Sequence, residues 1–363
     1  MSESRQRWVV AMSGGVDSSV AAALLAQTRE VVGITMDLGG TPDHAQPRRP
    51  GRCCGLPDAE DARAVARTLR IRHYTVNYRE SFKRHVIDPF VADYREGRTP
   101  IPCIACNRVM KFDLLLARAE QLGAAGLATG HYARIAPTPA GSPSLWRAVD
   151  RDKDQTYFLF DTPRHALERL EFPLGGLTKP EVREIAREFA LDTAEKPESQ
   201  GICFIPDGDV RAALQRLEPQ APRSPGPILA RDGAQLGEHS GAIGYTLGQR
   251  RGLGLSGGPW YVVEVRAAAN ELVVDRGHAL LRSRVEVRDA VWSDEQPTAS
   301  GEEVRVQVRH RQPAAEATLL RSCDRMELRF REPVWAAAPG QAAVVYDEAD
   351  QRVLGGGWIA ASA

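Results

Sequence analysis

"SGGVDSS", residues 13–19, joins an apolar run to a stretch rich in alanine and leucine. The run before it, "RWVVAM" (7–12), is typical of a buried strand, and "SSVAAALLAQ" (18–27) is typical of a helix. The two glycines of "SGGVDSS" let the backbone approach a ligand closely, and the N-terminus of the following helix favours an anion. The seven residues therefore predict a phosphate-binding turn, in which Asp17 would hold a magnesium ion that bridges phosphates.

The sequence beyond this turn alternates between strand-like and helix-like segments. Candidates follow one another at 30–36, 57–69, 71–77, 108–123 and 126–133. Such alternation predicts an α/β fold with a doubly wound parallel sheet that binds ligands at the carboxyl ends of its strands. The stretch 37–55 is rich in Gly, Pro and Arg, and we expect a long loop there.

Composition and hydrophobic period change in the second half of the chain. Thr178 and Glu181 form a capping-box signature that opens a helix. From Pro206 the chain becomes rich in Pro, Gly and Arg, which predicts a small irregular central domain. From Trp260 the period is two, which predicts a hairpin around Asn270 and then a small antiparallel β-barrel. We expect three domains, at 1–205, 206–275 and 276–363.

Composition also limits the class of protein. The 363 residues are 43% hydrophobic and 26% charged, which suits two or three packed domains. Lys and Arg number 47, as do Asp and Glu, so any RNA contact has to come from a local patch. We find neither a signal-peptide pattern nor an apolar run of membrane-spanning length, and we expect a cytoplasmic protein with no membrane partner.

Three of the six cysteines give a second chemical signal. Cys103 and Cys106 lie in "PCIACN", which we expect to be a loop after a proline, and Cys203 lies in "SQGICFI". In a cytoplasmic chain these thiols are not a disulfide framework. They could be zinc ligands, a redox pair, a nucleophile with its sulfur donor, or three ligands of an iron–sulfur cluster. Structural zinc is disfavoured because a second C-x-x-C is missing.

These motifs together resemble a known family. "SGGVDSS" after a first strand is similar to the PP-loop ATP pyrophosphatases, and this turn has neither the Walker pattern nor the G-x-G-x-x-G pattern. "TPIPCIACNRVMKF", "GLATGHYAR", "KDQTYFL", "ESQGICFI", "YTLGQRRGLG" and "RHRQ", in this order, resemble the tRNA-specific 2-thiouridylases (the MnmA family). The resemblance implies a PP-loop ATP-binding catalytic domain, a central domain and a C-terminal barrel that contacts tRNA. It implies sulfur transfer to C2 of the wobble uridine in the tRNAs for Lys, Glu and Gln.

The resemblance also implies a mechanism and its partners. Adenylation by ATP with Mg²⁺ would turn the C2 oxygen into a good leaving group, which enzyme-bound sulfur then displaces. Cys106 would be the nucleophile and Cys203 the persulfide carrier, and a Cys106–Cys203 disulfide would be left for reduction. A sulfur-relay protein or a cysteine desulfurase would supply the sulfur, and a monomer that binds one tRNA is the simplest expectation.

The family's binding residues carry over position by position. The implied ATP contacts are Ala11, Met12, Ser13, Gly14, Gly15, Val16, Asp17, Ser18, Met36 and Gly130. The implied tRNA contacts are Ile101, Pro102, Cys103, His131, Lys153, Asp154, Gln155, Arg309, His310 and Gln341. Among them, Lys153 suits a phosphate and Gln155 suits a base edge.

Two positions depart from the family pattern. Cys103 stands where many members have Asp, so Cys103, Cys106 and Cys203 could hold a [4Fe–4S] cluster with one open iron, or Cys103 could be a bystander. Ile101 stands where the family usually has Asn, which weakens a base contact there.

Other basic side chains are candidates for RNA contact. The residues Arg305, Gln307, Arg309 and Arg311 alternate, and we expect them to share one strand face that meets RNA or solvent. The "GQRRGLG" segment offers two arginines, either for RNA phosphates or as part of a structural loop.

Two rival functions stay open. One is a PP-loop synthetase of the amidotransferase type with another acceptor, although no glutaminase signature is present. The other is an RNA-binding module with a vestigial nucleotide loop, although the loop and the cysteines are intact. The sequence assigns no chemistry to Cys53, Cys54 and Cys323.

Overall fold

The computed structural model describes residues 5–39, 56–138, 140–198, 201–205, 207–220, 224–293, 301–322 and 325–363. The expected loop at 37–55 and the cysteines Cys53, Cys54 and Cys323 therefore lie wholly or largely outside the described residues. The chain divides into two compact units, described separately below. Unit 1 comprises residues 1–86, 103–208 and 351–353, and unit 2 comprises 87–102, 209–350 and 354–363.

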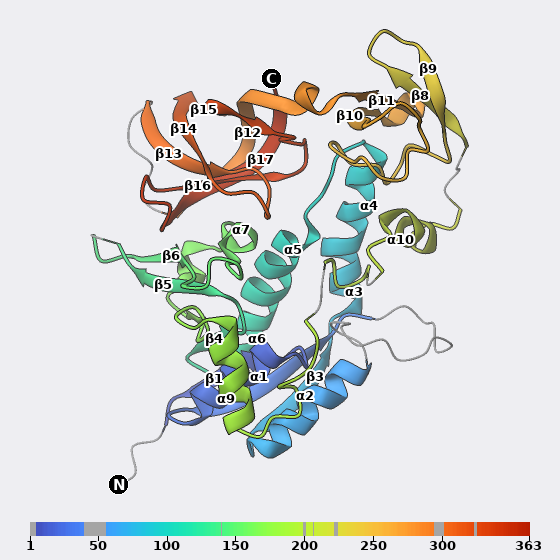
Figure 1. Ribbon diagram of the computed structural model, residues 1–363. Coiled ribbons are helices and arrows are strands. Elements are labelled where there is room, and N and C mark those ends of the chain that lie inside the picture. Colours follow the sequence, from blue (N-terminus) through green and yellow to red (C-terminus); the bar gives the residue numbers. More distant parts are fainter. Residues whose placement is uncertain are drawn as a thin grey trace. The chain divides into compact units, whose positions relative to one another are not determined.

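Unit 1 is built on a parallel sheet with the strand order β3-β2-β1-β4-β7 (Figure 1). Its strands are β1 (Arg7–Ala11), β2 (Glu30–Asp37), β3 (Arg72–Asn77), β4 (Gly126–Thr129) and β7 (Leu170–Glu171). Because β2 and β4 pair with opposite edges of β1, the carboxyl ends of β1 and β4 form the point where the strand order reverses. The predicted parallel α/β sheet is confirmed.

Helices surround this sheet, and an antiparallel hairpin follows β4. The helical segments up to residue 188, apart from α4, are α1 (Val16–Ala26), α2 (Leu56–Thr68), α3 (Arg79–Phe82), η1 (Lys83–Ile87), α5 (Pro102–Ala105), η2 (Cys106–Leu115), α6 (Leu116–Gln121), α7 (Thr156–Leu159), α8 (Arg164–Leu167) and α9 (Lys179–Glu188), and the hairpin is β5 (Ala133–Pro137) with β6 (Pro143–Arg147). One core joins β1, α1, α2 and α9 through Val10, Val20, Val65 and Val182, all almost fully buried. The capping box of Thr178 and Glu181 is confirmed, since the Thr178 N–H donates to Glu181 Oε2 over 2.7 Å.

The segment with Cys103 and Cys106 is helical, and its prediction as a loop was wrong. Pro102 begins helix α5, where a missing N–H costs nothing because the first helical turn has no acceptor for it. From Cys106 the chain continues as the π-helix η2, a form that is rare and often occurs at functional sites.

Unit 2 contains a small mixed sheet and a barrel. Helices α4 (Asp88–Arg95) and α10 (Val210–Leu217) accompany a sheet of order β10-β11-β8-β9, with β8 (Gly226–Ala230), β9 (Gln235–His239), β10 (Tyr261–Arg266) and β11 (Glu271–Asp275). The predicted hairpin is confirmed, because β10 and β11 pair antiparallel around Asn270, which has a left-handed φ of 54°. The short helices η3 (Ala267–Ala269) and η4 (Gly277–Leu280) flank β11.

The predicted C-terminal antiparallel barrel is also confirmed. It closes in the order β12-β15-β14-β13-β16-β17, from β12 (Leu281–Trp292), β13 (Glu302–Gln307), β14 (Ala315–Ser322), β15 (Arg325–Trp335), β16 (Ala342–Tyr346) and β17 (Val353–Ser362). Strand β13 ends at Gln307, whose buried amide is held by Tyr346 Oη and by the carbonyls of Arg309 and His310. The prediction of a four-residue polar strand face through Arg311 was therefore wrong.

Candidate functional site

The turn between β1 and α1 lies at the carboxyl end of the sheet and is shaped by its glycines. Gly14 has a φ of +74°, and a Cβ there would lie 2.2 Å from the Asp58 carbonyl oxygen. The hydroxyls of Ser18 and Ser19 both donate to the Gly15 carbonyl, over 3.1 and 2.9 Å, which closes the turn. The first-turn N–H groups of α1 have no intrahelical acceptors. The turn can therefore hold an anion at the positive end of the helix dipole.

The end of β4 packs directly against this turn. A Cβ on Gly130 would lie 2.6 Å from the Ser18 nitrogen, so only glycine permits the approach. Ala11 pairs with Thr129 across the two strands. Met12 directly follows β1, and Met36 is the last residue but one of β2. Both side chains are buried. The predicted nucleotide residues thus come together at the switch point of the sheet.

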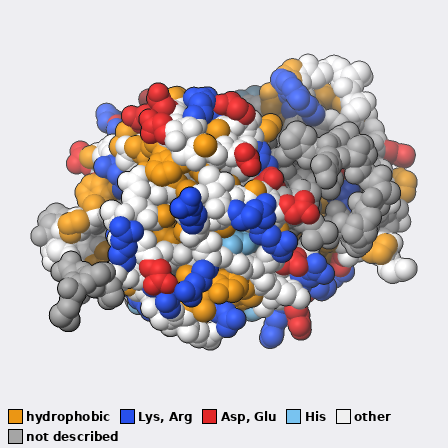
Figure 2. Space-filling model, turned by 90° about the horizontal axis from the view of Figure 1, so that it is seen from below, with side chains coloured by type: hydrophobic (Ala, Val, Ile, Leu, Met, Phe, Trp, Pro, Cys, Tyr) orange, Lys and Arg blue, Asp and Glu red, His pale blue; other side chains and the backbone are white. Residues whose placement is uncertain are grey.

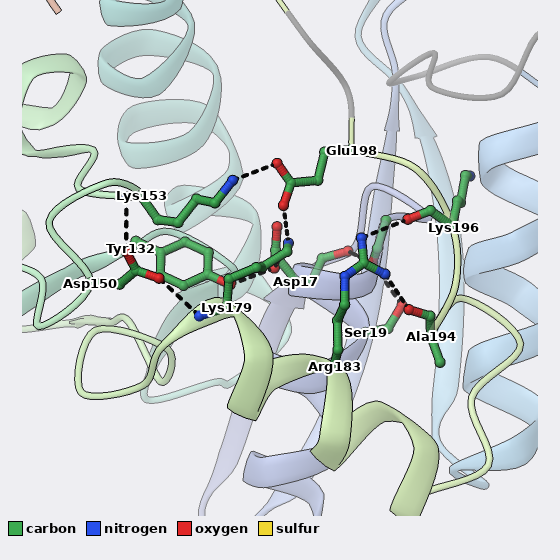
Figure 3. A network of polar contacts seen from close by, with 12 residues as sticks. Asp17, Ser19, Tyr132, Asp150, Lys153, Lys179, Arg183, Ala194, Lys196 and Glu198 are labelled. Atoms are coloured by element: carbon green, nitrogen blue, oxygen red, sulfur yellow. Dashed lines mark hydrogen bonds and ion pairs between the residues drawn. The ribbon is translucent and has the colours of Figure 1, made fainter. Parts of the chain in front are cut away.

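A network of ion pairs reaches the turn from α9 and from the segment after it (Figure 3). Lys179 Nζ lies 2.7 Å from Asp17 Oδ1, which also accepts a hydrogen bond of 2.9 Å from Tyr132 Oη. The same ammonium lies 3.1 Å from Glu198 Oε1, and Lys153 Nζ lies 2.8 Å from Glu198 Oε2. Burial, followed by the charge of Asp17 and its hydrogen bond, raises the pKa of Tyr132 far above its usual range, so its hydroxyl stays a donor.

A second lysine holds the turn from the other side. Lys196 Nζ donates to the Gly14 carbonyl over 3.0 Å and pairs with Asp58 at 2.8 Å and Asp61 at 2.6 Å. Arg183 on α9 donates to the carbonyls of Ala194 and Lys196, which fixes the segment that presents Lys196. The sequence analysis missed Lys179, Lys196, Glu198 and Tyr132. Lys179 carried one local signal, its place directly after the predicted cap Thr178.

A buried polar chain connects the helix of Cys106 with the end of β4. Asn107 donates to the Phe158 carbonyl over 3.0 Å and accepts from Lys111 Nζ over 2.8 Å. Lys111 also lies 3.1 Å from Nε2 of His131, whose Nδ1 is 2.5 Å from Thr129 Oγ1. Because an ammonium only donates, Nε2 accepts and Nδ1 carries the proton. Burial, and then the charge of Lys111, hold the pKa of His131 well below its usual range, so the ring is neutral.

The three candidate cysteines all belong to unit 1. Cys103 lies in α5, Cys106 begins η2, and Cys203 lies in the described segment 201–205, and each is partly exposed. The Phe204 ring packs edge-on against Phe82 at 5.8 Å between centroids, which anchors the residue next to Cys203. Among the described residues, no three His, Cys, Asp or Glu side chains form a group that could hold a metal ion. The three thiols therefore do not form a cluster ligand set here.

The expected tRNA residues of unit 1 differ in what they offer. Lys153 is partly exposed, and its ammonium pairs with Glu198, which also pairs with Lys179. Asp154 is buried, and its carboxylate pairs with Arg147 at 2.8 Å and accepts from Thr156 Oγ1 at 2.6 Å. Gln155 Oε1 accepts the Tyr132 N–H over 3.0 Å. Lys153 is thus the member whose side chain can turn toward a phosphate at small cost.

Three of the expected tRNA residues, Arg309, His310 and Gln341, lie on loops of unit 2. Arg309 donates to the Leu247 carbonyl over 2.7 Å, and its guanidinium lies 5.3 Å from the Trp335 ring centroid. His310 is exposed. Gln341 Nε2 donates to the Thr99 carbonyl over 2.8 Å, two residues before Ile101.

The surface charge is mixed. On the face drawn in Figure 2, basic and acidic side chains of the described residues lie interspersed, in keeping with the net charge of zero. Arg250 and Arg251 in unit 2 are both exposed. Any RNA contact on such a surface depends on a few local groups. No helix among the described residues has the length and apolarity that a membrane crossing requires.

Comparison with known proteins finds matches along the chain. A family profile described as "tRNA methyl transferase HUP domain" matches residues 6–207, one described as "tRNA methyl transferase PRC-barrel domain" matches 215–276, and one described as "Aminomethyltransferase beta-barrel domain" matches 282–359. The tRNA-specific 2-thiouridylase MnmA of Rhodospirillum rubrum is 48% identical over 368 residues, covering 98% of this chain and 96% of its own. That of Chloroflexus aurantiacus is 48% identical over 355 residues, covering 97% and 98%. Among solved structures, an NMN synthetase from Francisella tularensis has a TM-score of 0.34 and 19% identity over 61% of this chain and 80% of that chain.

Proposed function

This chain belongs to the family of tRNA-specific 2-thiouridylases, and we propose that it transfers sulfur to C2 of the wobble uridine of tRNA at the expense of ATP. One observation carries the proposal. The hydrogen-bonded chain from Asn107 through Lys111 to His131 ties the helix that begins with Cys106 to the strand end that packs on the nucleotide turn. The helix that carries the proposed nucleophile and the proposed phosphate-binding turn are thus both connected to the carboxyl end of β4.

The first step is adenylation of the base. The N–H groups at the start of α1 would face the phosphates, which favours departure of pyrophosphate as the C2 oxygen attacks the α-phosphorus. Asp17 fits a magnesium ion, because Mg²⁺ is usually held by one or two carboxylates together with substrate phosphates. Bound there, Mg²⁺ would neutralise charge on the departing pyrophosphate.

The second step moves sulfur. The terminal sulfur of a persulfide on Cys203 attacks C2, and the C2–O bond breaks to release AMP. The Cys106 thiolate then attacks the inner Cys203 sulfur, so that the terminal sulfur stays on C2 and a Cys106–Cys203 disulfide forms. An external dithiol restores both thiols with two electrons. We derive no step through an iron–sulfur cluster, because the described cysteines do not form its ligand set.

The proposed partners are those that the resemblance to the family implies. The substrates are the tRNAs for Lys, Glu and Gln, and the persulfide sulfur comes from a sulfur-relay protein or a cysteine desulfurase. Contacts to tRNA are proposed for Lys153 in unit 1 and for Arg309, His310 and Gln341 in unit 2. Ile101, Pro102 and Cys103 lie next to the proposed nucleophile and would border the target base.

The test is a defined reaction. Unmodified tRNA transcript, ATP, Mg²⁺ and a desulfurase with cysteine are incubated with the protein, and the RNA is digested to nucleosides for mass spectrometry. We expect 2-thiouridine only when ATP is present. A methylated nucleoside formed with S-adenosylmethionine, or ATP cleavage driven by a small carboxylate without RNA, would replace the proposal by methyl transfer or by a synthetase.

A further inference from the structure

Glu198 lies between two lysines, Lys179 at the start of α9 and Lys153 in the loop after β6 (Figure 3). Its Oε1 faces Lys179 at 3.1 Å and its Oε2 faces Lys153 at 2.8 Å. Lys179 continues the chain to Asp17 of the nucleotide turn, at 2.7 Å. Four charged groups of alternating sign therefore connect the nucleotide turn with the proposed tRNA contact.

The exposure of these groups shows where ligands can act. The Lys179 side chain is 9% exposed, so its charge needs a partner at all times. Asp17 at one end and Lys153 at the other are about one-third exposed and can reach a ligand. Burial alone would raise the pKa of Glu198, but the hydrogen bonds and charges of Lys153 and Lys179 lower it below its usual value, so the carboxylate stays ionised.

We propose that Glu198 is a positioning residue that couples tRNA binding to nucleotide binding. When Lys153 turns to an RNA phosphate, Glu198 keeps Lys179 as its lysine partner, which draws that ammonium away from Asp17. The Lys179 ammonium then no longer competes with a nucleotide-bound cation for the Asp17 carboxylate. In reverse, engagement of Asp17 by the nucleotide complex shifts Lys179 toward Glu198 and loosens Lys153. Each ligand therefore strengthens the binding of the other.

This inference rests on the proposed function, and a binding experiment separates the two. The dissociation constant of the magnesium complex of α,β-methylene-ATP is measured by calorimetry with and without unmodified tRNA transcript. We expect tRNA to tighten nucleotide binding about fivefold, at the lower end of usual coupling because the Lys153–Glu198 pair is partly exposed. Linkage requires the nucleotide to tighten tRNA binding by the same factor.

Glu198→Gln keeps the shape of the side chain and removes its charge, and it should reduce the fivefold ratio to about one. Glu195→Gln is the matched control, because Glu195 pairs with Arg187 at 2.8 Å in the same segment, is exposed, and lies outside the chain of charges. It should leave the ratio unchanged. Should Glu198→Gln fail to fold, Glu198→Asp serves instead, since its shorter reach loosens one of the two contacts and lowers the ratio.

The outcomes are distinct. A ratio near one in the native protein, with both ligands bound, overturns the coupling and leaves the proposed function intact. Equal weakening of both ligands in Glu198→Gln, with the ratio preserved, shows a purely structural residue and also overturns the coupling. Failure of the native protein to bind either ligand overturns the proposed function and the coupling with it.

Discussion

Lys111 Nζ lies 3.1 Å from Nε2 of His131, so the lysine ammonium donates to a buried neutral ring. Thr129 Oγ1 accepts from the other ring nitrogen, which fixes the tautomer. A protonated ring would place two positive charges in contact and would lose its acceptor for Lys111. The pair therefore makes the nucleotide-turn end of β4 sensitive to acid.

This sensitivity has a calculable sign. Because the folded pKa of His131 lies below the ordinary value of 6.5, the unfolded chain takes up a proton first as the pH falls. The contribution of the neutral His131 ring to the free energy of unfolding is fully present above about pH 6.5. Below that pH this contribution decreases by up to ~1.4 kcal/mol per pH unit. His73 adds to the loss, since burial and then Arg63 lower its pKa too.

Urea unfolding at a series of pH values checks this expectation. The free energy of unfolding of His131→Gln should depend less on pH between about 6.5 and 5.5 than that of the native protein. Equal slopes for the two proteins would show that another group dominates the acid response.

Gly14 and Gly15 are predicted to tolerate substitution very differently. Gly14→Ala places a Cβ 2.2 Å from the Asp58 carbonyl at a φ of +74°, and we expect a loss of roughly 1–3 kcal/mol in the free energy of unfolding. Gly15 has a φ of −92°, and its Cβ would meet nothing nearer than Ser13 Oγ at 3.6 Å. Gly15→Ala should change stability by less than about 0.5 kcal/mol. Denaturant midpoints of both variants decide the matter, and equal losses would contradict it.

The cysteines are predicted to contribute unequally. Cys106→Ala and Cys203→Ala should abolish 2-thiouridine formation, because each removes a sulfur that the proposed exchange requires. Cys103→Ala should keep most of it. The product is quantified after nucleoside digestion, with adenylation of tRNA as the control that both inactive variants still bind ATP and substrate.

Iron and acid-labile sulfide in protein purified without oxygen give the independent check. Iron at cluster stoichiometry that is lost together with activity in Cys103→Ala would replace the persulfide pair by a three-cysteine cluster.

The exposed arginines Arg250 and Arg251 should contribute to tRNA affinity through phosphates. Arg250→Ala is expected to weaken binding about two- to fivefold and to lower the slope of log affinity against log salt by about one. Arg329→Ala is the control, because Arg329 is also exposed but pairs with Glu327 at 2.6 Å on the barrel. Titrations at several salt concentrations measure both effects, and an unchanged slope in Arg250→Ala would assign the loop a structural role.

Local patterns predicted well what local interactions decide. The strand, turn and helix around Asp17 and the cap at Thr178 depend on neighbours within a few positions. The charged partners of the turn could not be found this way. Lys179 lies 162 positions from Asp17, and Lys196 lies 182 positions from Gly14. No periodicity connects residues that far apart, and only the folded sheet brings them together.

The failed predictions have equally specific causes. The proline at 102 favours a loop in the sequence, whereas at the first helical position a proline is well tolerated. The alternation from Arg305 to Arg311 continues in the sequence, but the strand ends at Gln307 because the Gln307 amide caps the following turn.

Within unit 2, the anchoring of Thr99 has a consequence for biosynthesis. Its N–H donates to the Pro339 carbonyl over 3.0 Å and its carbonyl accepts from Gln341, partners some 240 residues downstream. During translation the strands around the nucleotide turn can pair early, but the segment that leads into Cys103 meets its anchor only when the last barrel strands emerge from the ribosome. A nascent or truncated chain would thus have the segment before Cys103 without this anchor. The anchoring of this segment therefore depends on synthesis of the C-terminal part of the chain.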